Sequence, residues 1–420
     1  MFEKAGALFP LCRSITGPGL RQTLDAIGAE IPLQRHQLAS GQPVFDWTIP
    51  DEWSIRDAWI KNAAGERVVD FREHNLHVLG YSEPFQGRLS AEDLKAHCYT
   101  LPDHPDRIPY RTSYYKRQWG FCLTQHQYDA LTEPEYDVCI DSTLGPGVLD
   151  YAQCVVPGAT SDEVIVSAHV CHPSLANDNL SGITLAMQLA RALTDIETRY
   201  TYRFIFAPGT IGAIAWLSEH QAQAKERVRH GLILACVGDT APFTYKQSRR
   251  GDAPVDRAAS LVLGLHAEGS TIKPFSPYGY DERQYCSPGF DLPVGCFMRS
   301  GPGGYPEYHT SGDNLGLLRP HALGESFTNA LRIFEALEGD GTYLNTNPHC
   351  EPQLGKRGLY SAVGGRTDTR AVEMAMLWVL NYSDGGNSLI DIALRAQLPF
   401  AAIRAAADAL LDAGLLVAAE

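Results

Sequence analysis

The segment from Glu163 to Asp195 constrains the fold of this chain more than any other. Its apolar run, Glu163–Ala168, leads directly into a polar loop that supplies His169, His172 and Asp178. The residues from Ser181 to Asp195 then have the apolar periodicity of a helix. In α/β proteins the chemistry lies where strands end in such loops, at the carboxyl edge of the sheet. The segment therefore predicts an α/β fold with a polar site at this edge.

Strand-sized apolar runs recur along the chain between residues 148 and 344. These runs are Tyr151–Val156, Glu163–Ala168, Tyr202–Ala207, Leu232–Val237, Leu261–Leu265 and Val294–Met298. Helical stretches separate several of them, which is typical of a mostly parallel sheet with helices on both faces. We expect this α/β domain to span residues 142–346.

The sequence on either side of this domain has a different character. Residues Ala5–Gly28 are predicted to form a helix with a break at Thr16-Gly-Pro-Gly19, and we assign residues 1–43 to the α/β domain as its N-terminal helical part. Residues 44–141 alternate short aromatic and β-branched runs with turn residues, which predicts an inserted small antiparallel β domain. Residues 347–420 offer three amphipathic helices, starting near Thr367, and a short apolar end. This order of elements predicts a C-terminal winged helix.

Length and charge exclude several classes of protein. A chain of 420 residues is too long for one compact core and suggests two or three domains. A net charge of −14 argues against nucleic-acid binding, and no apolar run is long enough for a membrane helix. The N-terminus lacks the features of a secretory signal, and the ten cysteines include no CxxC pair. We therefore expect a cytoplasmic protein with no nucleic-acid or membrane partner.

The C-terminal helices do not have the charge of a DNA-binding module. From Thr367 onward there are three arginines and seven acidic residues, and the helix expected at Ala401–Ala413 is mostly alanine and leucine. A recognition helix needs basic residues that contact phosphates. We expect this domain to serve protein–protein packing, including the formation of a homo-oligomer.

Two strand ends and one later loop carry candidate metal ligands. The first strand ends at His169, another leads to Asp239, and a Gly/Pro-rich loop contains His309. Histidine and aspartate together suit a borderline ion such as zinc. Each residue also has a structural alternative, since His169 could be a hydrogen-bonded histidine, Asp178 a helix cap and Asp239 a turn cap. Together they favour a metal site.

The runs Asp178-Asn-Leu-Ser-Gly182 and Tyr308-His-Thr310 resemble motifs of the zinc aminopeptidase family that includes the glutaminyl cyclases. The resemblance implies that His169, Asp178, Asp239 and His309 bind metal, with Asp178 bridging two zinc ions. The layout of an inserted β domain, an α/β domain and a winged helix further resembles a family of bacterial aminopeptidase-like proteins. Membership would imply an association with surface-polysaccharide or secondary-metabolite gene clusters.

Two positions depart from the pattern of the zinc aminopeptidases. Cys171 stands where that family has an aspartate, and the stretch Ala207–Gly212 has no carboxylate where the family has a Glu-Glu pair. That pair supplies the general base and a metal ligand, so its loss would slow peptide hydrolysis. His169, Asp178 and Asp239 still suffice for one ion. The half-site of Asp178 and His309 needs a further ligand, for which His172 and Glu282 are candidates.

These observations lead to a functional hypothesis with alternatives. We expect a hydrolase that uses one or two zinc ions and cleaves an amide bond of a peptide or a small metabolite. Glu282 and Glu307 are the candidate catalytic acids. Residues that could hold a substrate carboxylate or chain end are Arg299, Tyr305 and Tyr308. The alternatives are a catalytically altered metal-binding or scaffold protein, and an acyl transferase or cyclase on the same fold.

Overall fold

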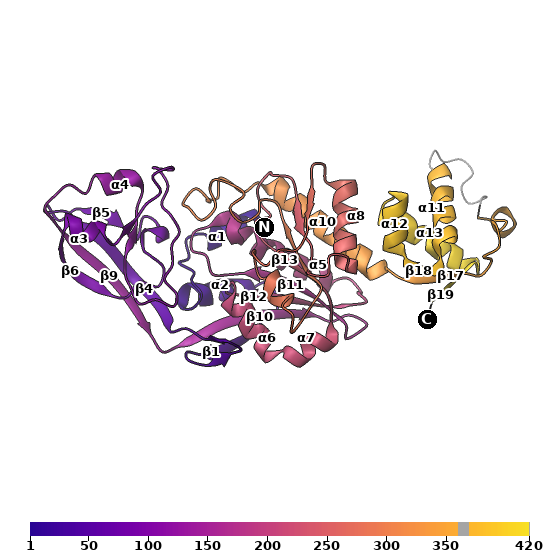
Figure 1. Ribbon diagram of the computed structural model, residues 1–420, viewed down its shortest axis with the longest axis horizontal. Helices are drawn as coiled ribbons and strands as arrows, with labels where there is room; N and C mark the ends of the chain where they lie inside the picture. Colours follow the sequence, from indigo (N-terminus) through magenta and orange to yellow (C-terminus); the bar gives the residue numbers. More distant parts are fainter. Residues whose placement is uncertain (360–368, 420) are drawn as a thin grey trace.

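The computed structural model describes residues 1–359 and 369–419 and has an elongated shape (Figure 1). A central α/β unit lies between a β-rich unit at one end and a C-terminal helical unit at the other. Thr367, where we set the start of the C-terminal helices, and the acidic residues Asp368 and Glu420 lie outside the described residues.

The central unit is built on a mixed sheet of eight strands, in the order β1-β10-β12-β11-β13-β16-β14-β15. Their bounds are β1 (Gln34–Ala39), β10 (Val148–Val156), β12 (Thr201–Ala207), β11 (Glu163–His169), β13 (Val228–Leu234), β16 (Val294–Met298), β14 (Thr244–Lys246) and β15 (Thr271–Lys273). The four central strands β12, β11, β13 and β16 are parallel, whereas β1, β10 and β14 form antiparallel pairs. The predicted mostly parallel sheet is confirmed.

Helices cover both faces of this sheet, because successive residues of its central strands are buried on opposite sides. In β11, Val164 and Val166 pack in one core with α2 (Pro18–Gly28), α5 (Gly182–Thr194), α8 (Pro254–His266) and α10 (Pro320–Gly339). Ile165 packs in a second core with α6 (Ile211–Glu219). Burial on both faces explains the continuous apolar runs in the sequence. The smaller helices of this unit are α1 (Phe2–Leu8), α7 (Gln221–Arg227) and α9 (Glu282–Tyr285).

One predicted strand is wrong. Leu261–Leu265 forms the last part of helix α8, which begins at Pro254. The buried residues Val255, Ala258 and Val262 recur at helical spacing, and proline is favoured in the first turn of a helix. The five apolar residues Leu261–Leu265 are too few to show this helical period, so they were interpreted as a strand.

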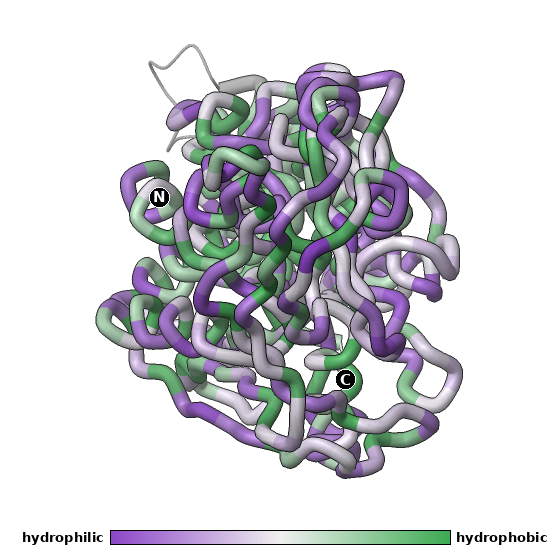
Figure 2. Tube along the Cα trace, turned by 90° about the vertical axis from the view of Figure 1, so that its left-hand side faces the viewer, coloured by the Kyte–Doolittle hydropathy of each residue, from purple (hydrophilic) through white to green (hydrophobic). Residues whose placement is uncertain are grey.

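The inserted unit contains a four-stranded antiparallel sheet in the order β5-β4-β9-β6. Its strands are β4 (Glu52–Lys61), β5 (Arg67–Asp70), β6 (Phe85–Ser90) and β9 (Glu135–Gly145), accompanied by the hairpin β2 (Pro43–Val44) and β3 (Trp47–Thr48), the parallel pair β7 (Cys98–Tyr99) and β8 (Phe121–Cys122), and the helices α3 (Ala91–Lys95) and α4 (Gln125–Asp129). Buried and more exposed residues alternate along β9. Figure 2, in which this unit faces the viewer, shows the corresponding mixture of hydrophilic and hydrophobic segments.

The C-terminal unit has the winged-helix arrangement that the sequence predicts. Its helices are α11 (Thr369–Tyr382), α12 (Leu389–Ala396) and α13 (Phe400–Asp412), and its antiparallel sheet has the order β18-β17-β19, formed by β17 (Thr342–Asn345), β18 (Asp384–Ser388) and β19 (Leu416–Ala418). An ion pair between Arg257 of α8 and Asp391 of α12, at 3.3 Å, links this unit to the α/β unit. Arg404 of α13 pairs with Asp408. The predicted domain limits and the role in packing stay predictions.

Two observations concern the cellular location. Among the helices in the described ranges, none combines the length and the apolar character needed to cross a membrane. All ten cysteines are free thiols. The cytoplasmic location stays a prediction.

The buried His230 of β13 gives a testable dependence of stability on pH. Burial lowers its pKa to about 3, below the value of about 6.5 expected in the unfolded chain. The unfolded state therefore takes up a proton first, so the stability from this residue is complete above about pH 6.5 and falls as the pH drops. Between about pH 7.5 and about pH 5, we expect the wild-type protein to lose roughly 2 kcal/mol more unfolding free energy than His230→Phe in urea titrations. Equal losses in the two proteins would contradict this assignment.

Candidate metal centre

The loop that follows β11 brings two candidate ligands together. His169 is the last residue of β11, where it pairs with Ala207 of β12, and the chain then loops back to the start of α5. Asp178 lies in an irregular helical turn, Ala176–Ser181, directly before α5, and its side chain is fully buried. The parallel sheet therefore places both side chains at its carboxyl edge, as the sequence predicts.

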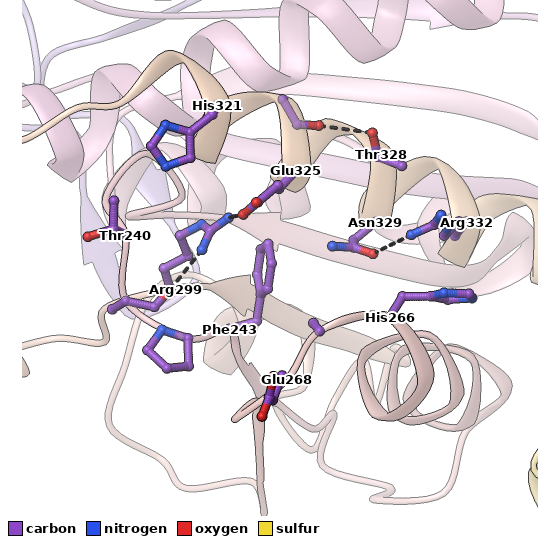
Figure 3. A pocket seen from close by; sticks show the side chains of 14 residues that line it. Thr240, Phe243, His266, Glu268, Arg299, His321, Glu325, Thr328, Asn329 and Arg332 are labelled. Carbon is purple, nitrogen blue, oxygen red and sulfur yellow. Dashed lines mark hydrogen bonds and ion pairs between the residues drawn. The ribbon is translucent and has the colours of Figure 1, made fainter.

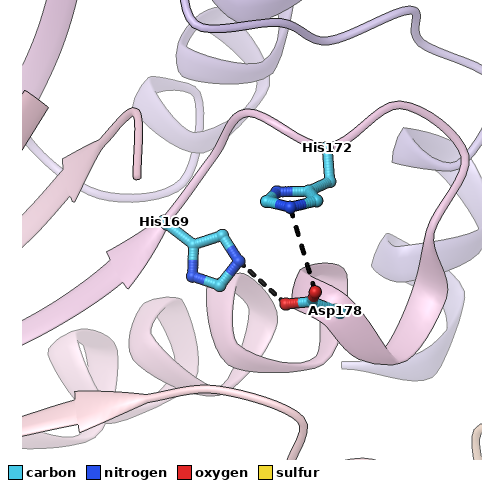
Figure 4. Close-up of side chains that lie close together, drawn as sticks. All are labelled: His169, His172 and Asp178. Carbon is cyan, nitrogen blue, oxygen red and sulfur yellow. Dashed lines mark hydrogen bonds and ion pairs between the residues drawn. The ribbon is translucent and has the colours of Figure 1, made fainter. Parts of the chain in front are cut away.

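Three imidazoles converge on the carboxylate of Asp178. His169 Nε2 lies 2.9 Å from Asp178 Oδ1, and His309 Nε2 lies 3.0 Å from Oδ2. His172 Nε2 lies 3.9 Å from Oδ2, and Figure 4 shows both His169 and His172 directed at the carboxylate. We call His169, His172, Asp178 and His309 the His/Asp cluster. Among the described residues, His169, His172 and Asp178 form the one group of three or more His, Cys, Asp or Glu side chains close enough to share an ion.

Electrostatics favour an ionised aspartate in this cluster. Burial by itself would raise the pKa of Asp178, but the charges and hydrogen bonds of the imidazoles hold this pKa well below its ordinary value. Burial and the neighbouring imidazoles lower the pKa of His172 well below its ordinary value, so this ring is neutral and can offer a lone pair. The cluster thus pairs one carboxylate anion with imidazole donors.

The loop that carries His172 is fixed by a buried arginine and a thiol. Arg13 donates from Nε to the carbonyl oxygen of His172 at 2.9 Å. Cys171 accepts a hydrogen bond from the amide of Gly209 at 3.2 Å, and burial raises the pKa of its thiol to about 12. Cys171 is therefore a neutral thiol at pH 7 and not a thiolate ligand.

Asn179 determines which nitrogen of His169 carries the proton. The Asn179 amide oxygen accepts from the backbone amides of Gly182 and Cys236, so its NH₂ group faces His169 Nδ1 at 3.2 Å. This contact makes Nδ1 an acceptor and places the imidazole proton on Nε2, directed at Asp178. An ion bound at Nε2 would take the place of this proton, so binding would release it.

Asp313 positions the backbone on which Asp178 lies. Its carboxylate accepts from the amides of Asn177 at 2.6 Å and Asp178 at 3.0 Å, and from the hydroxyl of Tyr305 at 3.0 Å. Burial raises the pKa of Asp313 to about 7. Tyr305, a predicted substrate residue, therefore contacts a supporting carboxylate. The sequence signal for Asp313 was its position four residues after His309.

Asp239 lies outside the His/Asp cluster. Its Oδ2 accepts from the side-chain amide of Asn177 at 2.7 Å, and its Oδ1 accepts from the backbone amide of Ala241 at 2.7 Å. The contact with Ala241 stabilises a turn, which is the alternative that the sequence left open, and the contact with Asn177 joins Asp239 to the stretch directly before Asp178. β13 ends at Leu234, so Asp239 lies in the turn that follows the strand, and it is not among the side chains close enough to share an ion with His169, His172 and Asp178.

Asp281 provides a carboxylate where the sequence has none after β12. Its Oδ1 accepts from the amide of Thr210 at 2.7 Å, directly before α6, and its side chain lines the cavity at the His/Asp cluster. Burial raises the pKa of Asp281 above its ordinary value, against the opposing charge of His169. A buried carboxylate with a raised pKa beside candidate metal ligands has the properties of a general base.

The two predicted catalytic glutamates are engaged elsewhere. Glu282 is fully buried and pairs with Lys246, with Oε1 2.6 Å from Nζ. Lys246 also donates to the carbonyl of Tyr278, so this pair anchors the loop that carries Asp281. Glu307 pairs with Arg107 of the inserted unit at 3.0 Å. The geometry brings neither glutamate to the His/Asp cluster.

The inserted β unit contributes directly to the centre. Its segment 107–110 runs beside the His309 loop, through an antiparallel bridge between Pro109 and Thr310 and a 2.8 Å hydrogen bond from the Tyr110 amide to the His309 carbonyl. The ring of Tyr110 lies 5.0 Å from that of His172 and 5.1 Å from that of His309. Sequence reasoning missed Tyr110, since no local pattern links it to residues about 200 positions away.

A cavity of about 250 Å³ opens onto the His/Asp cluster. Its walls include the three histidines, Asp281 and the aromatic rings of Tyr110, Tyr114, Tyr280 and Tyr308. The ring of Tyr308, a predicted substrate residue, stacks on His309 at 4.0 Å, and the ring of Tyr280 stacks on His169 at 5.4 Å. Within the described residues, the cavity is lined by neither lysine nor arginine.

Arg299 belongs to a different cavity, of about 680 Å³, between the end of α8 and the first half of α10 (Figure 3). Its guanidinium donates to the carbonyls of Ala241 and Ala322, pairs with Glu325 at 2.5 Å, and lies 4.0 Å from the ring centre of Phe243. The predicted role of holding a substrate at the metal centre does not fit this position. Its donors are used to join α10 to the sheet.

This position predicts a structural effect for Arg299. Replacement by methionine leaves the carbonyl of Ala241 without this donor, whereas the carbonyl of Ala322 keeps its partner within helix α10. An unsatisfied group costs about 1–3 kcal/mol, so we expect Arg299→Met to lower the free energy of unfolding by roughly 1–3 kcal/mol. Zinc binding by the folded protein should not change. Loss of zinc binding at unchanged stability would restore Arg299 to the metal centre.

The donor set fits a zinc ion. Imidazole nitrogen and carboxylate oxygen are both zinc ligands, and three protein ligands with an open position are typical of catalytic sites. The His/Asp cluster offers such donors beside a cavity. A second ion would need a further carboxylate, and Asp239 is hydrogen-bonded elsewhere.

Comparisons with known proteins agree with this architecture. A profile of the family described as "Domain of unknown function (DUF4910)" matches residues 2–340. The chain belongs to this family. A second profile, described as winged helix-turn-helix, matches residues 341–418 of this DUF4910 protein.

Relatives of the chain are found in Clostridium acetobutylicum. A protein named "Putative polysaccharide biosynthesis protein with aminopeptidase-like domain" is 48% identical over 409 residues, which are 97% of this chain and 94% of that protein. The crystal structure of a "putative peptidase" from this organism has a TM-score of 0.93 and 45% identity, and the match covers 99% of this chain and 95% of that chain.

A more distant match shows the fold. BSAP, a zinc aminopeptidase from Bacillus subtilis, has a TM-score of 0.57 and 13% identity, over 80% of this chain and 95% of that chain. The DUF4910 protein therefore has an aminopeptidase-like fold, which confirms the resemblance inferred from the motifs around Asp178 and His309.

Proposed function

We propose that this DUF4910 protein is a zinc-dependent hydrolase that cleaves an amide bond of a peptide or small metabolite. The observation that carries this proposal is the convergence of His169, His172 and His309 on the buried Asp178, at the wall of a cavity that also contains Asp281. A metal site, an adjacent carboxylate and room for a substrate are the components of metal-assisted hydrolysis.

We assign one zinc ion to the His/Asp cluster. The ligand atoms of His169, His172 and Asp178 lie close enough together to hold one ion, and His309 lies beside them on Oδ2 of Asp178. When bound, zinc would supply Lewis-acid chemistry by polarising the amide carbonyl and lowering the pKa of water. The engagement of Asp239 in a turn supports one ion rather than two.

Asp281 has the position and protonation behaviour of the general base. In the reaction, water adds to the amide carbonyl, the C–N bond breaks, and a carboxylate and an amine result. Asp281 would take the proton from the attacking water and return it to the leaving nitrogen. Its hydrogen bond from the Thr210 amide fixes one oxygen and leaves the other for this transfer. The rings of Tyr280 and Tyr308 would exclude bulk water from the reacting atoms.

The names of the relatives support an amide substrate. BSAP is a zinc aminopeptidase, and the Clostridium acetobutylicum protein is named for polysaccharide biosynthesis and an aminopeptidase-like domain. Peptides and N-acylated sugars both contain the required bond. We also propose that the protein acts in the cytoplasm and forms a homo-oligomer through its winged helix.

Two measurements on the purified protein test the proposed function. Metal analysis after purification without chelator should give about one zinc per chain, and removal of zinc with a chelator should abolish amide hydrolysis that added zinc restores. The substrate panel should contain aminoacyl-anilides, short peptides and N-acetylated sugars. Absence of zinc, or hydrolysis that survives its removal, would contradict the proposal.

A further inference from the structure

The turn between β12 and α6 has a rare backbone conformation at Thr210. Its φ and ψ are 61° and −73°, and across it the amide of Ile211 donates to the carbonyl of Gly209 at 2.8 Å. This combination is the γ-turn with a positive φ, which is rare and strained. Threonine is branched at its β-carbon, so a positive φ is especially unfavourable for it. Strain of this kind persists only where the surrounding structure enforces it, and it is concentrated at functional sites.

The packing of α6 against β12 enforces this conformation. A β-carbon at Gly212, in the first turn of α6, would lie 2.6 Å from Pro208 Cδ and 2.9 Å from the β-carbon of Ala207 at the end of β12. Glycine is needed for this close approach, so the turn between the two elements is tight. The amide of Thr210 is held at the same time by Asp281 Oδ1, at 2.7 Å. A relaxed φ at Thr210 would therefore require α6 or Asp281 to move.

The same turn places Thr210 in the wall of the cavity at the His/Asp cluster. Thr210 and Gly209 both line this cavity, together with His169 and Asp281. A β-carbon at Gly209 would lie 3.7 Å from the β-carbon of His169 and 3.4 Å from Cys171 Sγ. The backbone of the turn thus packs directly against the loop that carries the candidate metal ligands. Thr210 is the residue of this turn whose side chain can contact a molecule in the cavity.

The hydroxyl of Thr210 has a proton available for such a molecule. Arg283 of α9 donates from Nη2 to Thr210 Oγ1 at 3.3 Å, and this is the one hydrogen bond that the described residues give to Oγ1. The Nε atom of Arg283 is buried and has no hydrogen-bond partner in the described part of the chain. A threonine hydroxyl can accept and also donate one proton. Because it accepts from a guanidinium cation, its own proton is a stronger hydrogen-bond donor.

We propose that Thr210 is a catalytic residue whose hydroxyl donates a hydrogen bond to the carbonyl oxygen of the amide substrate. Negative charge develops on this oxygen as water adds to the carbonyl carbon, and a fixed donor stabilises that charge more than it stabilises the substrate. The strained turn fixes the donor, and Arg283 polarises it. A nucleophilic role would need a base that accepts the hydroxyl proton, and the described residues supply none. This inference rests on the proposed amide hydrolase function.

Substitutions at Thr210 separate the hydroxyl from the backbone strain. Valine keeps the branched β-carbon without the hydroxyl, glycine removes both, and serine keeps the hydroxyl. We expect Thr210→Val and Thr210→Gly to lower kcat on the best amide of the panel by about 10²–10³-fold with little change in KM, and Thr210→Ser to stay within about tenfold of the wild type. Thr328→Val is the matched control, since Thr328 of α10 lines the cavity of Arg299 (Figure 3) and should leave kcat unchanged.

Unfolding in urea tests the strain itself. Thr210→Val and Thr210→Gly both lack the hydroxyl and its hydrogen bond from Arg283, so a difference between them reports the β-carbon at a positive φ. We expect the glycine variant to unfold at a higher urea concentration than the valine variant, because glycine adopts a positive φ without strain. The opposite order would overturn the argument from strain. A glycine variant that is more stable than the valine variant and equally inactive is not the result of a merely structural role.

Binding of acetohydroxamate to the zinc-loaded protein separates this contact from turnover. The probe has a carbonyl group and binds zinc, and isothermal titration calorimetry measures its affinity. We expect Thr210→Val to weaken binding by about tenfold and Thr210→Ser to restore it. If Thr210→Val keeps the wild-type kcat on an amide, the role of Thr210 is overturned and the hydrolase stands. If no amide is hydrolysed but probe binding needs the hydroxyl, the hydrolase is overturned and the contact stands. Protein that binds neither zinc nor the probe would overturn both.

Discussion

Replacement of Asp178 by asparagine is expected to remove zinc from the protein and to abolish amide hydrolysis. Asp178 is the carboxylate on which three imidazoles converge, and its side chain is fully buried. The imidazoles hold its pKa well below the ordinary value despite burial, so the residue is an anion at every pH at which the protein would work. Asparagine keeps the shape and removes the charge that offsets the ion.

Known effects of residues that support metal ligands set a lower limit on the loss of zinc affinity in Asp178→Asn. Loss of a residue that only supports a ligand weakens metal binding by about 10–100-fold, so loss of this central carboxylate should exceed about 100-fold. Zinc titration of the apo-protein with a competing chromophoric chelator measures the change directly. Circular dichroism of the same sample establishes whether the variant is folded.

Asp239→Asn is the matched control for this experiment. The substitution is chemically the same, Asp239 is also buried, and the resemblance to zinc aminopeptidases implies that it is a ligand. The structure instead gives both of its oxygens hydrogen bonds, one from the side-chain amide of Asn177 and one from the backbone amide of Ala241. We expect Asp239→Asn to retain one zinc per chain at near wild-type affinity. Equal loss of zinc in the two variants would show that Asp239 moves into the centre when metal binds.

The features that sequence reasoning predicted are those with a local signal. The strand that ends at His169, the polar loop and the helix after Ser181 follow one another in the chain, and their periodicity is visible in the sequence. His309 was identified from the run Tyr308-His-Thr310, although it lies 131 positions from Asp178, its partner in the structure. Two separate motifs thus predicted the long-range contact between Asp178 and His309, which hydrophobic periodicity alone does not indicate.

The predicted site residues that the structure places away from the His/Asp cluster depend on backbone direction over one or two positions. Asp281 and Glu282 are neighbours in the sequence, and either could have faced the cluster. At the start of a helix, successive side chains point about 100° apart, so α9 directs Asp281 to the cavity and Glu282 to Lys246. Asp239, in the turn after Leu234, is hydrogen-bonded to Asn177 and Ala241. Charge and residue type alone do not distinguish these positions.

The contribution of the inserted β unit to the site could not be predicted from the sequence, for a different reason. The alternation of short β-type runs and turn residues predicted a separate antiparallel domain. The ring of Tyr110 in this unit nevertheless contacts those of His172 and His309. The contact joins segments about 200 residues apart, and the Arg107–Glu307 ion pair strengthens it. No pattern within a single sequence reports such a contact. The result is that the insertion belongs to the candidate site and is not an appendage.

Asp281→Asn is expected to lower kcat by roughly 10²–10⁴-fold while the protein keeps its zinc, because a positioned general base contributes about this factor. Burial raises the pKa of Asp281 above that of an ordinary aspartate. A base works only when deprotonated, so wild-type kcat/KM should rise with pH through this raised pKa. The residual activity of the variant should lack that rise. The measurement is a pH profile of kcat/KM on the best amide substrate from the panel.

Glu282→Gln is the control that separates the base from its neighbour. Glu282 pairs with the buried Lys246, and the loss of a buried ion-pair partner costs about 3–5 kcal/mol of stability. The variant should therefore unfold at lower denaturant concentration, yet its acid limb in the pH profile should match that of the wild type. If Glu282→Gln removed the rise of kcat/KM with pH and Asp281→Asn kept it, Glu282 and not Asp281 would be the general base. In that case the Lys246–Glu282 pair would have to open during catalysis. Lys246→Met, which releases Glu282, would then shift the pH at which kcat/KM rises.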